Sequence, residues 1–505
     1  YVDRAAGGPE AVRRLARGGA VPLYAWDVRL FEPGSPREAL VRLGPDGRVV
    51  GVRRTLAEED RRPTVSEAAG RRAAERALAR FAPAAPGAAA GGAAWRFVAA
   101  SVETQPRSGR VERTYRYELA GVRVGEAPVR ADVVVTGADR ARGGGDGAEL
   151  LRLRTWADVP ESWRRQYDEM RASNDLYASL TLPAMLAFLV GAVVALARAG
   201  RPNAGGARSP AVRWRPALAV GALVGGLLAV AAVNQLPLAW FGYDTATAPR
   251  TFVLQQLLGA AAAGVGTTVF VTVIVAAAEL LTRRAFPWQT DWYAFVRRRD
   301  DPGVGTQLLG GYALAAFGFA YVTLFYLGAR RLLGWWVPTG SLDDPNQIAT
   351  ALPWVSAIGT ALFAGVWEEA AFRAVPLAAL SLWVGRRPTR RWWMAGGVAL
   401  TALVFGFGHA NYPSWPAYSR GVELFLEAAL WAVLYLRVGL PITIVGHVLY
   451  DLVWFGLFAA HGQGRAYATT LLVVVLVGLI PALLALDGAL RRRRAARARR
   501  VPAPA

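Results

Sequence analysis

Residues 468–486 read ATTLLVVVLVGLIPALLAL and contain no charged side chain. About 20 apolar residues suffice for a helix to cross the hydrocarbon of a bilayer, so this stretch predicts a membrane-spanning helix. Eight further apolar runs precede it, near residues 176–197, 216–237, 252–281, 304–329, 348–384, 394–409, 421–436 and 441–460. We therefore expect an all-α polytopic membrane protein with about nine transmembrane helices, preceded by a soluble α+β domain.

The composition of the chain agrees with a membrane protein. Of its 505 residues, 54% are hydrophobic and 19% are charged, which excludes a disordered or collagen-like chain. The net charge of +21 would suit nucleic acid, but every basic residue is Arg and many lie in short loops between apolar runs. We therefore expect the lipid bilayer as a partner, and no nucleic acid.

The basic loops predict an orientation. Arg residues fill the loops within 198–215, 283–299 and 386–391 and the tail after residue 490, whereas the alternating loops carry few. Loops rich in Arg face the cytoplasm, so the C-terminus is expected inside and, after nine crossings, the N-terminal domain outside. The bias toward Arg and Ala is typical of a GC-rich bacterial genome, which makes a bacterial cell membrane the expected location.

Two features of the chain limit its chemistry and its interpretation. It contains no cysteine, which excludes disulfides, thiol catalysis and cysteine-ligated metal. It begins at Tyr1, without Met or a signal peptide in view, which leaves a preceding leader or first helix open.

We divide the chain into four parts. Residues 1–175 form an extracytoplasmic α+β domain, 176–345 the N-terminal transmembrane helices, 346–487 the core, and 488–505 a basic cytoplasmic tail. The first part shows strand patterns at 23–31, 40–43, 48–52, 95–103, 110–119 and 129–135, helices at 66–81 and 161–170, and a linker at 82–94. This repeated hairpin and helix resembles two PepSY-type units. We expect a solvated domain held beside the membrane core, with substrate recognition or inhibition as alternatives.

Ionisable groups inside the apolar runs are the first candidates for function, because burial in lipid is costly unless such groups are paired or hydrated. They occur in three segments: Gly365-Val-Trp-Glu368-Glu369-Ala-Ala-Phe-Arg373, Phe405-Gly-Phe-Gly-His409 and Gly446-His447-Val-Leu-Tyr-Asp451. Two of the three histidines of the chain lie here. We expect one polar centre assembled from these three segments.

The spacing of the acidic residues suggests different roles for them. Glu369 and Arg373 are four residues apart, so they share a helix face and can form a charge pair. Glu368 is turned by about 100° from Glu369 and is left without that cation. It is therefore the better candidate for a general base that takes a proton from water.

The histidines supply the other half of such a site. Asp451 lies four residues after His447 and can accept a hydrogen bond from its ring, while His409 provides a second donor. One base and two polarising groups suit the attack of water on an amide carbonyl, in which negative charge develops on the oxygen.

Together, the three motifs resemble the CPBP family of intramembrane proteases, also called Abi or type II CAAX prenyl endopeptidase-like, over residues 350–460. The resemblance implies an endopeptidase that cleaves membrane-associated proteins or peptides with activated water. Glu368 would activate the water, Glu369 and Arg373 would complete the first motif, His409 would bind the water or the oxyanion, and His447 would pair with Asp451. Members with Asn at the last position have a donor there, whereas Asp451 can only accept, which favours its orienting His447. A prenyl requirement does not follow from these residues.

Several alternatives remain open. The family is often labelled a metalloprotease, and Glu368, His409 and His447 could bind zinc, in which case Glu369 would be the base. We expect no metal, and chelators distinguish the two schemes. A proton-coupled transporter and a catalytically inactive scaffold are the other functional alternatives.

Two positions are hard to interpret from sequence. His409 lies toward the outer end of its run and His447 near the inner end of its own, so tilt, a broken helix or a misplaced boundary is needed to bring them together. Glu423 and Glu427 are four residues apart and repel each other, so at least one is expected to be protonated or near the surface. We expect a structural role for this pair, with contact to the substrate as the alternative.

Overall fold

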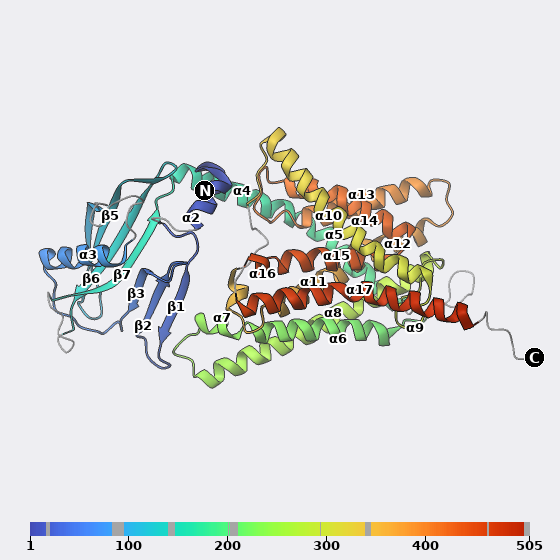
Figure 1. The fold of residues 1–505 in the computed structure, drawn as a ribbon, viewed down its shortest axis with the longest axis horizontal. Helices are drawn as coiled ribbons and strands as arrows, with labels where there is room; N and C mark the ends of the chain where they lie inside the picture. Colours follow the sequence, from blue (N-terminus) through green and yellow to red (C-terminus); the bar gives the residue numbers. More distant parts are fainter. Residues whose placement is uncertain are drawn as a thin grey trace, which may run out of the picture. The chain divides into compact units, whose positions relative to one another are not determined.

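The computed structural model describes residues 1–16, 21–82, 95–139, 147–199, 201, 211–292, 294–338, 345–461 and 464–498. Most of the expected linker 82–94 and the last residues of the basic tail lie outside the described residues. The chain forms two compact units: Tyr1–Asp168 with Phe241–Val253, and Glu169–Trp240 with Leu254–Ala505 (Figure 1).

The first unit is built on a single antiparallel sheet. Its seven strands follow the order β1-β2-β3-β7-β6-β5-β4. The strands are β1 (Trp26–Phe31), β2 (Glu38–Leu43), β3 (Val49–Thr55), β4 (Trp95–Thr104), β5 (Val111–Val124), β6 (Ala127–Gly137) and β7 (Ala148–Ala157). The sequence analysis placed the first six and missed β7. That strand joins the two halves of the sheet, since it pairs with β3 on one side and β6 on the other.

One helix covers part of this sheet. Helix α3 (Glu67–Phe81) begins where the sequence predicts, because the Ser66 hydroxyl accepts a hydrogen bond from the backbone N–H of Ala69. Its apolar residues pack on the middle of the sheet in a core that includes Ala74, Leu78, Tyr115, Tyr117, Val133 and Leu153. Two further helices, α1 (Val2–Ala5) and α2 (Gly8–Ala16), precede the strands.

The first unit also contains a distant segment of the chain, Phe241–Val253. Arg29 on β1 donates hydrogen bonds to the carbonyl oxygens of Phe241 and Tyr243, at 2.9 and 2.7 Å. The ring of Tyr243 also packs against Phe31 and Phe252. A division of the sequence into consecutive ranges at residue 175 does not capture this arrangement.

In the part of the chain that the structure describes, the second unit is helical. Helix α4 (Glu161–Ser179) runs into it from the first unit. The helices that follow are α5 (Leu182–Ala197), α6 (Trp214–Asn234), α7 (Leu236–Phe241), α8 (Pro249–Ala285), α9 (Ala294–Arg297), α10 (Pro302–Leu333), α11 (Pro353–Glu369), α12 (Val375–Val384), α13 (Arg390–Gly408), α14 (Ser419–Arg437), α15 (Leu440–Gly456), α16 (Phe458–His461) and α17 (Arg465–Ala498).

The second unit is that of an integral membrane protein. Five described helical segments are long and apolar enough to cross a bilayer: Glu161–Ala197, Trp214–Phe241, Pro249–Ala285, Pro302–Leu333 and Arg465–Arg497. Helix α15 is apolar but shorter. The expected number of about nine crossings is therefore not confirmed, and α11 to α15, which carry the candidate residues, are not among the five.

Candidate active site

The first motif lies where the helix changes its winding. Glu368 and Glu369 end α11, and Ala370–Ala374 form a π-helix before α12 begins. The N–H of Val375 donates to the carbonyl oxygen of Ala370, five residues earlier. The next residue, Pro376, has no N–H to continue an α-helical ladder. Such π-turns occur frequently at functional sites.

Glu369 and Arg373 form the ion pair that their spacing predicts. Nη1 of Arg373 lies 3.1 Å from Oε1 of Glu369, and both side chains are almost fully buried. The guanidinium also stacks on the ring of Phe405, 3.9 Å from its centroid. Phe405 is the first residue of the second motif, and the sequence analysis gave it no role of its own. It holds the buried cation against α13.

His447 is oriented by a different residue from the one that the sequence suggests. Its Nδ1 lies at hydrogen-bond distance, 2.8 Å, from Oε1 of Glu369 on α11. Asp451, four residues later on its own helix, has Oδ2 at 3.5 Å from Nε2. Close packing of α11 on α15 explains the difference, because Gly365 faces Val448 with no room for a side chain. The carboxylate of the neighbouring helix is therefore the better acceptor.

His409 completes the centre from the end of α13. It is the first residue beyond the helix, and its Nδ1 lies 2.8 Å from the carbonyl oxygen of Phe405. A carbonyl can only accept, so Nδ1 carries the hydrogen and Nε2 of the neutral ring is an acceptor. The position of His409 at a helix end lets the two histidines meet despite their different places in their runs.

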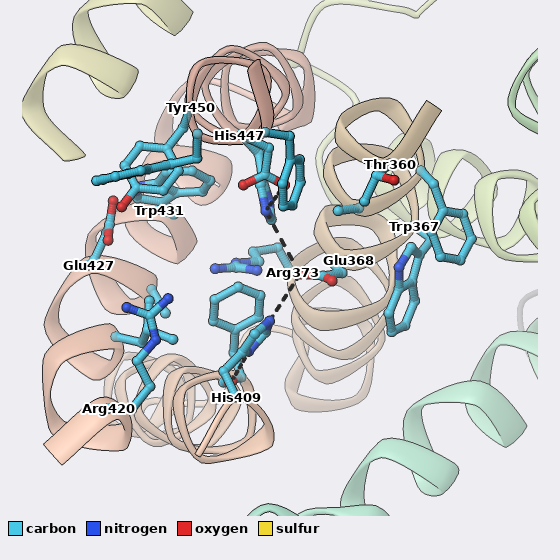
Figure 2. Close-up of a pocket in the computed structure, with 18 of the residues that line it drawn as sticks. Thr360, Trp367, Glu368, Arg373, His409, Arg420, Glu427, Trp431, His447 and Tyr450 are labelled. Atoms are coloured by element: carbon cyan, nitrogen blue, oxygen red, sulfur yellow. Dashed lines mark hydrogen bonds and ion pairs between the residues drawn. The ribbon is translucent and has the colours of Figure 1, made fainter. Parts of the chain in front are cut away.

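Both imidazoles face Glu368. Its Oε2 lies 3.7 Å from Nε2 of His409 and 3.8 Å from Nε2 of His447. This oxygen is buried and accepts no hydrogen bond from a described residue. Figure 2 shows the two rings pointing toward Glu368 from two sides, with Arg373 between them. The sequence segments therefore converge as expected, around a carboxylate that is free to bind a further group.

These residues line a cavity of about 270 Å³. Its wall is formed by α11, α13, α14 and α15 and by the loop after α13 (Figure 2). The sequence analysis did not assign the lining residues Tyr412, Arg420, Trp431, Tyr450 and Trp454. Glu427 also lines the cavity, and both it and Glu423 are buried, so neither lies near the surface. Arg420, Glu427 and Trp431 are spaced along one face of an apolar helix, and this spacing could have predicted that α14 contributes to the cavity wall.

The residues considered for zinc are close together without forming a metal-binding group. Among the described residues, no set of three or more His, Asp and Glu side chains is arranged to hold a metal ion. Oε2 of Glu368 lies 3.7 Å from Nε2 of His409 and 3.8 Å from Nε2 of His447. Nδ1 of each ring is bonded to an oxygen atom, so Nε2 is the ring atom that faces Glu368.

The fold and this centre define an integral membrane protein with a buried carboxylate–imidazole site. Residues 350–453 match the family described as Type II CAAX prenyl endopeptidase Rce1-like, which confirms the family resemblance for this segment. The match includes all six candidate residues and supports a CAAX-type intramembrane protease at the level of the family. No curated protein and no solved structure is significantly similar to the chain. The comparisons give no support for the PepSY-like resemblance, the Abi label or the metalloprotease label.

Proposed function

We propose that this protein is an intramembrane endopeptidase that hydrolyses peptide bonds of membrane-associated proteins or peptides. The observation that carries the proposal is the buried, unpartnered Oε2 of Glu368, which faces Nε2 of both His409 and His447. A water molecule bound among these three atoms would contact a proton acceptor and two ring nitrogens at once.

In the proposed reaction, Glu368 takes a proton from water while the water oxygen bonds to the carbonyl carbon of the substrate. The electron pair of the C=O bond moves to its oxygen. When the intermediate collapses, the C–N bond breaks and Glu368 returns the proton to the leaving nitrogen. One water molecule is consumed, and the peptide bond becomes a carboxyl and an amino group.

The histidines have distinct parts in this scheme. The neutral ring of His409 accepts a hydrogen bond from the water through Nε2, because Nδ1 is committed to Phe405. His447, when protonated, donates from Nε2 to the developing oxyanion, and Glu369 and Asp451 balance its charge. No metal ion takes part in the proposed reaction.

Comparative proteomics of membranes tests this function. Cells that express the wild-type protein should contain a membrane-protein fragment that is missing from cells with Glu368→Gln, and the purified wild-type protein should produce it in liposomes. Identical fragments from both proteins would contradict the assignment. Solute flux in liposomes that depends on Glu368, without cleavage, would favour a transporter instead.

We also propose a bacterial cell membrane as the location, with the sheet unit outside and the C-terminal tail in the cytoplasm. The Arg-rich loops support this orientation. Because the chain lacks cysteine, single cysteines can be introduced and labelled. An impermeant maleimide should label Ser35→Cys in intact cells but Arg386→Cys only after permeabilisation; the opposite pattern would reverse the orientation.

A further inference from the structure

The wall of the cavity formed by α14 carries a second buried carboxylate that the proposed reaction does not use. Glu427 is 6% exposed, and its Oε1 is buried without a hydrogen-bond partner among the described residues. Figure 2 shows this carboxylate beside Trp431 and Tyr450. A buried carboxyl group without a partner is protonated until a cation pairs with it, and a cationic ligand in the cavity would keep Glu427 ionised.

The cation of the wall on the same helix, α14, is already paired. Nη1 of Arg420 lies 2.5 Å from Oε2 of Glu423, and the same oxygen accepts a hydrogen bond from Tyr326 at 3.0 Å. Glu423 is fully buried and lies outside the cavity lining. The charge of Arg420 is therefore largely balanced by Glu423, and Glu427 has no arginine partner among the residues that the structure describes.

The excess of acidic over basic side chains is not confined to Glu427 but is found around the whole cavity. Arg373 pairs with Glu369, as Arg420 pairs with Glu423. Three further carboxylates line the cavity without an arginine partner among the described residues: Glu368, Glu427 and Asp451. A cavity with this excess of acidic groups attracts a cation.

Aromatic rings line the same cavity as Glu427. Trp431, Tyr450 and Trp454 line the cavity, and Tyr450 is held by stacking on Phe319, with ring centroids 4.8 Å apart. Faces of such rings attract ammonium and guanidinium groups. The indole N–H of Trp431 is buried without an acceptor among the described residues and can donate to a peptide carbonyl.

The neighbouring helix leaves space for this carboxylate. A Cβ atom on Gly318 of α10 would lie 2.6 Å from Oε1 of Glu427 and 3.1 Å from the ring of Tyr450. Any side chain at this position would displace one of the two. Glycine at residue 318 therefore accommodates Glu427 in its place in the wall.

We propose that Glu427, with Trp431, Tyr450 and Trp454, forms a subsite that binds a Lys or Arg side chain of the substrate close to the scissile bond. The inference rests on the proposed peptidase function and specifies its substrate class. Glu427 is a specificity-determining residue in this scheme. The carboxylate pairs with the basic group, and the rings contact its methylene chain and charge.

Binding to an inactive protein tests the subsite without requiring cleavage. The probes are two N-myristoylated alanine heptapeptide amides that carry either lysine or norleucine at the central position. In a neutral detergent, the full-length Glu368→Gln protein should bind the lysine peptide about tenfold more tightly, which corresponds to about 1.4 kcal/mol. Adding Glu427→Gln should reduce this ratio to within about twofold.

A matched control separates the subsite from a general effect of removing a buried acid. Glu279 is also buried, but it pairs with Arg283 and Arg213 and does not line the cavity. Glu279→Gln should leave the lysine preference unchanged. Where Glu427→Gln does not fold, Gly318→Ala, which crowds the same carboxylate, should weaken the preference.

The outcomes separate the two proposals. Equal binding of both peptides by the Glu368→Gln protein, or a lysine preference that survives the loss of Glu427, overturns the subsite. Cleavage that is the same in wild type and Glu368→Gln overturns the proposed catalytic function, while the binding ratio still reports on Glu427. A cleavage rate about tenfold higher for the lysine peptide in the wild type supports both.

Discussion

Nδ1 of His447 lies 2.8 Å from Oε1 of Glu369, a residue on another helix. The same carboxylate oxygen lies 3.1 Å from Arg373. Glu369 therefore links the cation of the first motif to the imidazole of the third. Through His447 this network extends to Asp451. Asp451, which lies four residues after His447 on the same helix, is more distant than Glu369, with Oδ2 3.5 Å from Nε2.

This geometry predicts that Glu369 matters more than Asp451 for the orientation of His447. Glu369→Gln should lower kcat about 10²-fold, because the acceptor for Nδ1 loses its charge. Asp451→Asn should change kcat less than about tenfold. Steady-state cleavage of the fragment precursor identified by proteomics measures both, and a larger loss in Asp451→Asn would contradict the assignment.

The pairing of Arg373 predicts a large effect on stability. Arg373→Leu leaves the charge of Glu369 buried beside His447 and should destabilise the protein by about 3–5 kcal/mol. The double variant Arg373→Leu, Glu369→Leu removes both charges and should melt at a higher temperature than Arg373→Leu in detergent. If the double variant melts lower, the pair is not the origin of the loss.

Close contact between α11 and α15 predicts a sensitive glycine. A Cβ atom on Gly365 would lie 2.6 Å from Cγ2 of Val448 and 3.0 Å from its backbone nitrogen. Gly365→Ala should force the helices apart and lengthen the contact between Glu369 and His447, with a loss of at least about tenfold in kcat/KM. Gly396→Ala, where no atom lies within 4 Å, is the matched control and should retain activity. Full activity in both variants would contradict this packing.

The sheet unit offers a prediction of pH dependence. A hydrogen bond from the Arg62 guanidinium holds the pKa of Asp60 below its usual range. Its stabilising effect is therefore present above the pKa of the unfolded state, about 3.9, and is lost as the pH falls through the lower folded value.

Asp60→Asn should consequently destabilise the sheet by about 1–3 kcal/mol at pH 7 and by less near pH 2. Hydrogen exchange of the amides in β3 and β7 measures this difference, because Arg62 also pairs with Glu149 on β7. An effect of the same size at both pH values would exclude this ion pair as the cause.

Removal of metal ions tests the metal-free reaction directly. Treatment with 1,10-phenanthroline should leave cleavage by the wild-type protein unchanged if Glu368 alone activates the water. If zinc bound by Glu368, His409 and His447 were required, activity would be lost and restored by added zinc.

Local sequence patterns predicted much of this fold. The start of α3 at Ser66 and six of the seven strands follow from capping and from alternation of apolar residues, which depend on near neighbours in the chain. The spacing of Glu369 and Arg373 likewise predicted their ion pair, because one turn of helix brings them together. The strand β7 was not predicted, although the buried Leu151 and Leu153 alternate with exposed residues in it. The single continuous sheet, which β7 completes, was therefore not predicted either.

Apolar runs, and the cost of placing charges within them, were sufficient to predict a membrane protein and a polar centre assembled from three motifs. Three relationships emerge only when the chain is folded: Glu369 contacts His447, Glu427 lines the cavity, and Phe241–Val253 belongs to the sheet unit. These relationships depend on how closely helices and strands approach across the fold, as at Gly365 and Val448. That distance is set by the packing of side chains from separate segments, and no local period in the sequence encodes it.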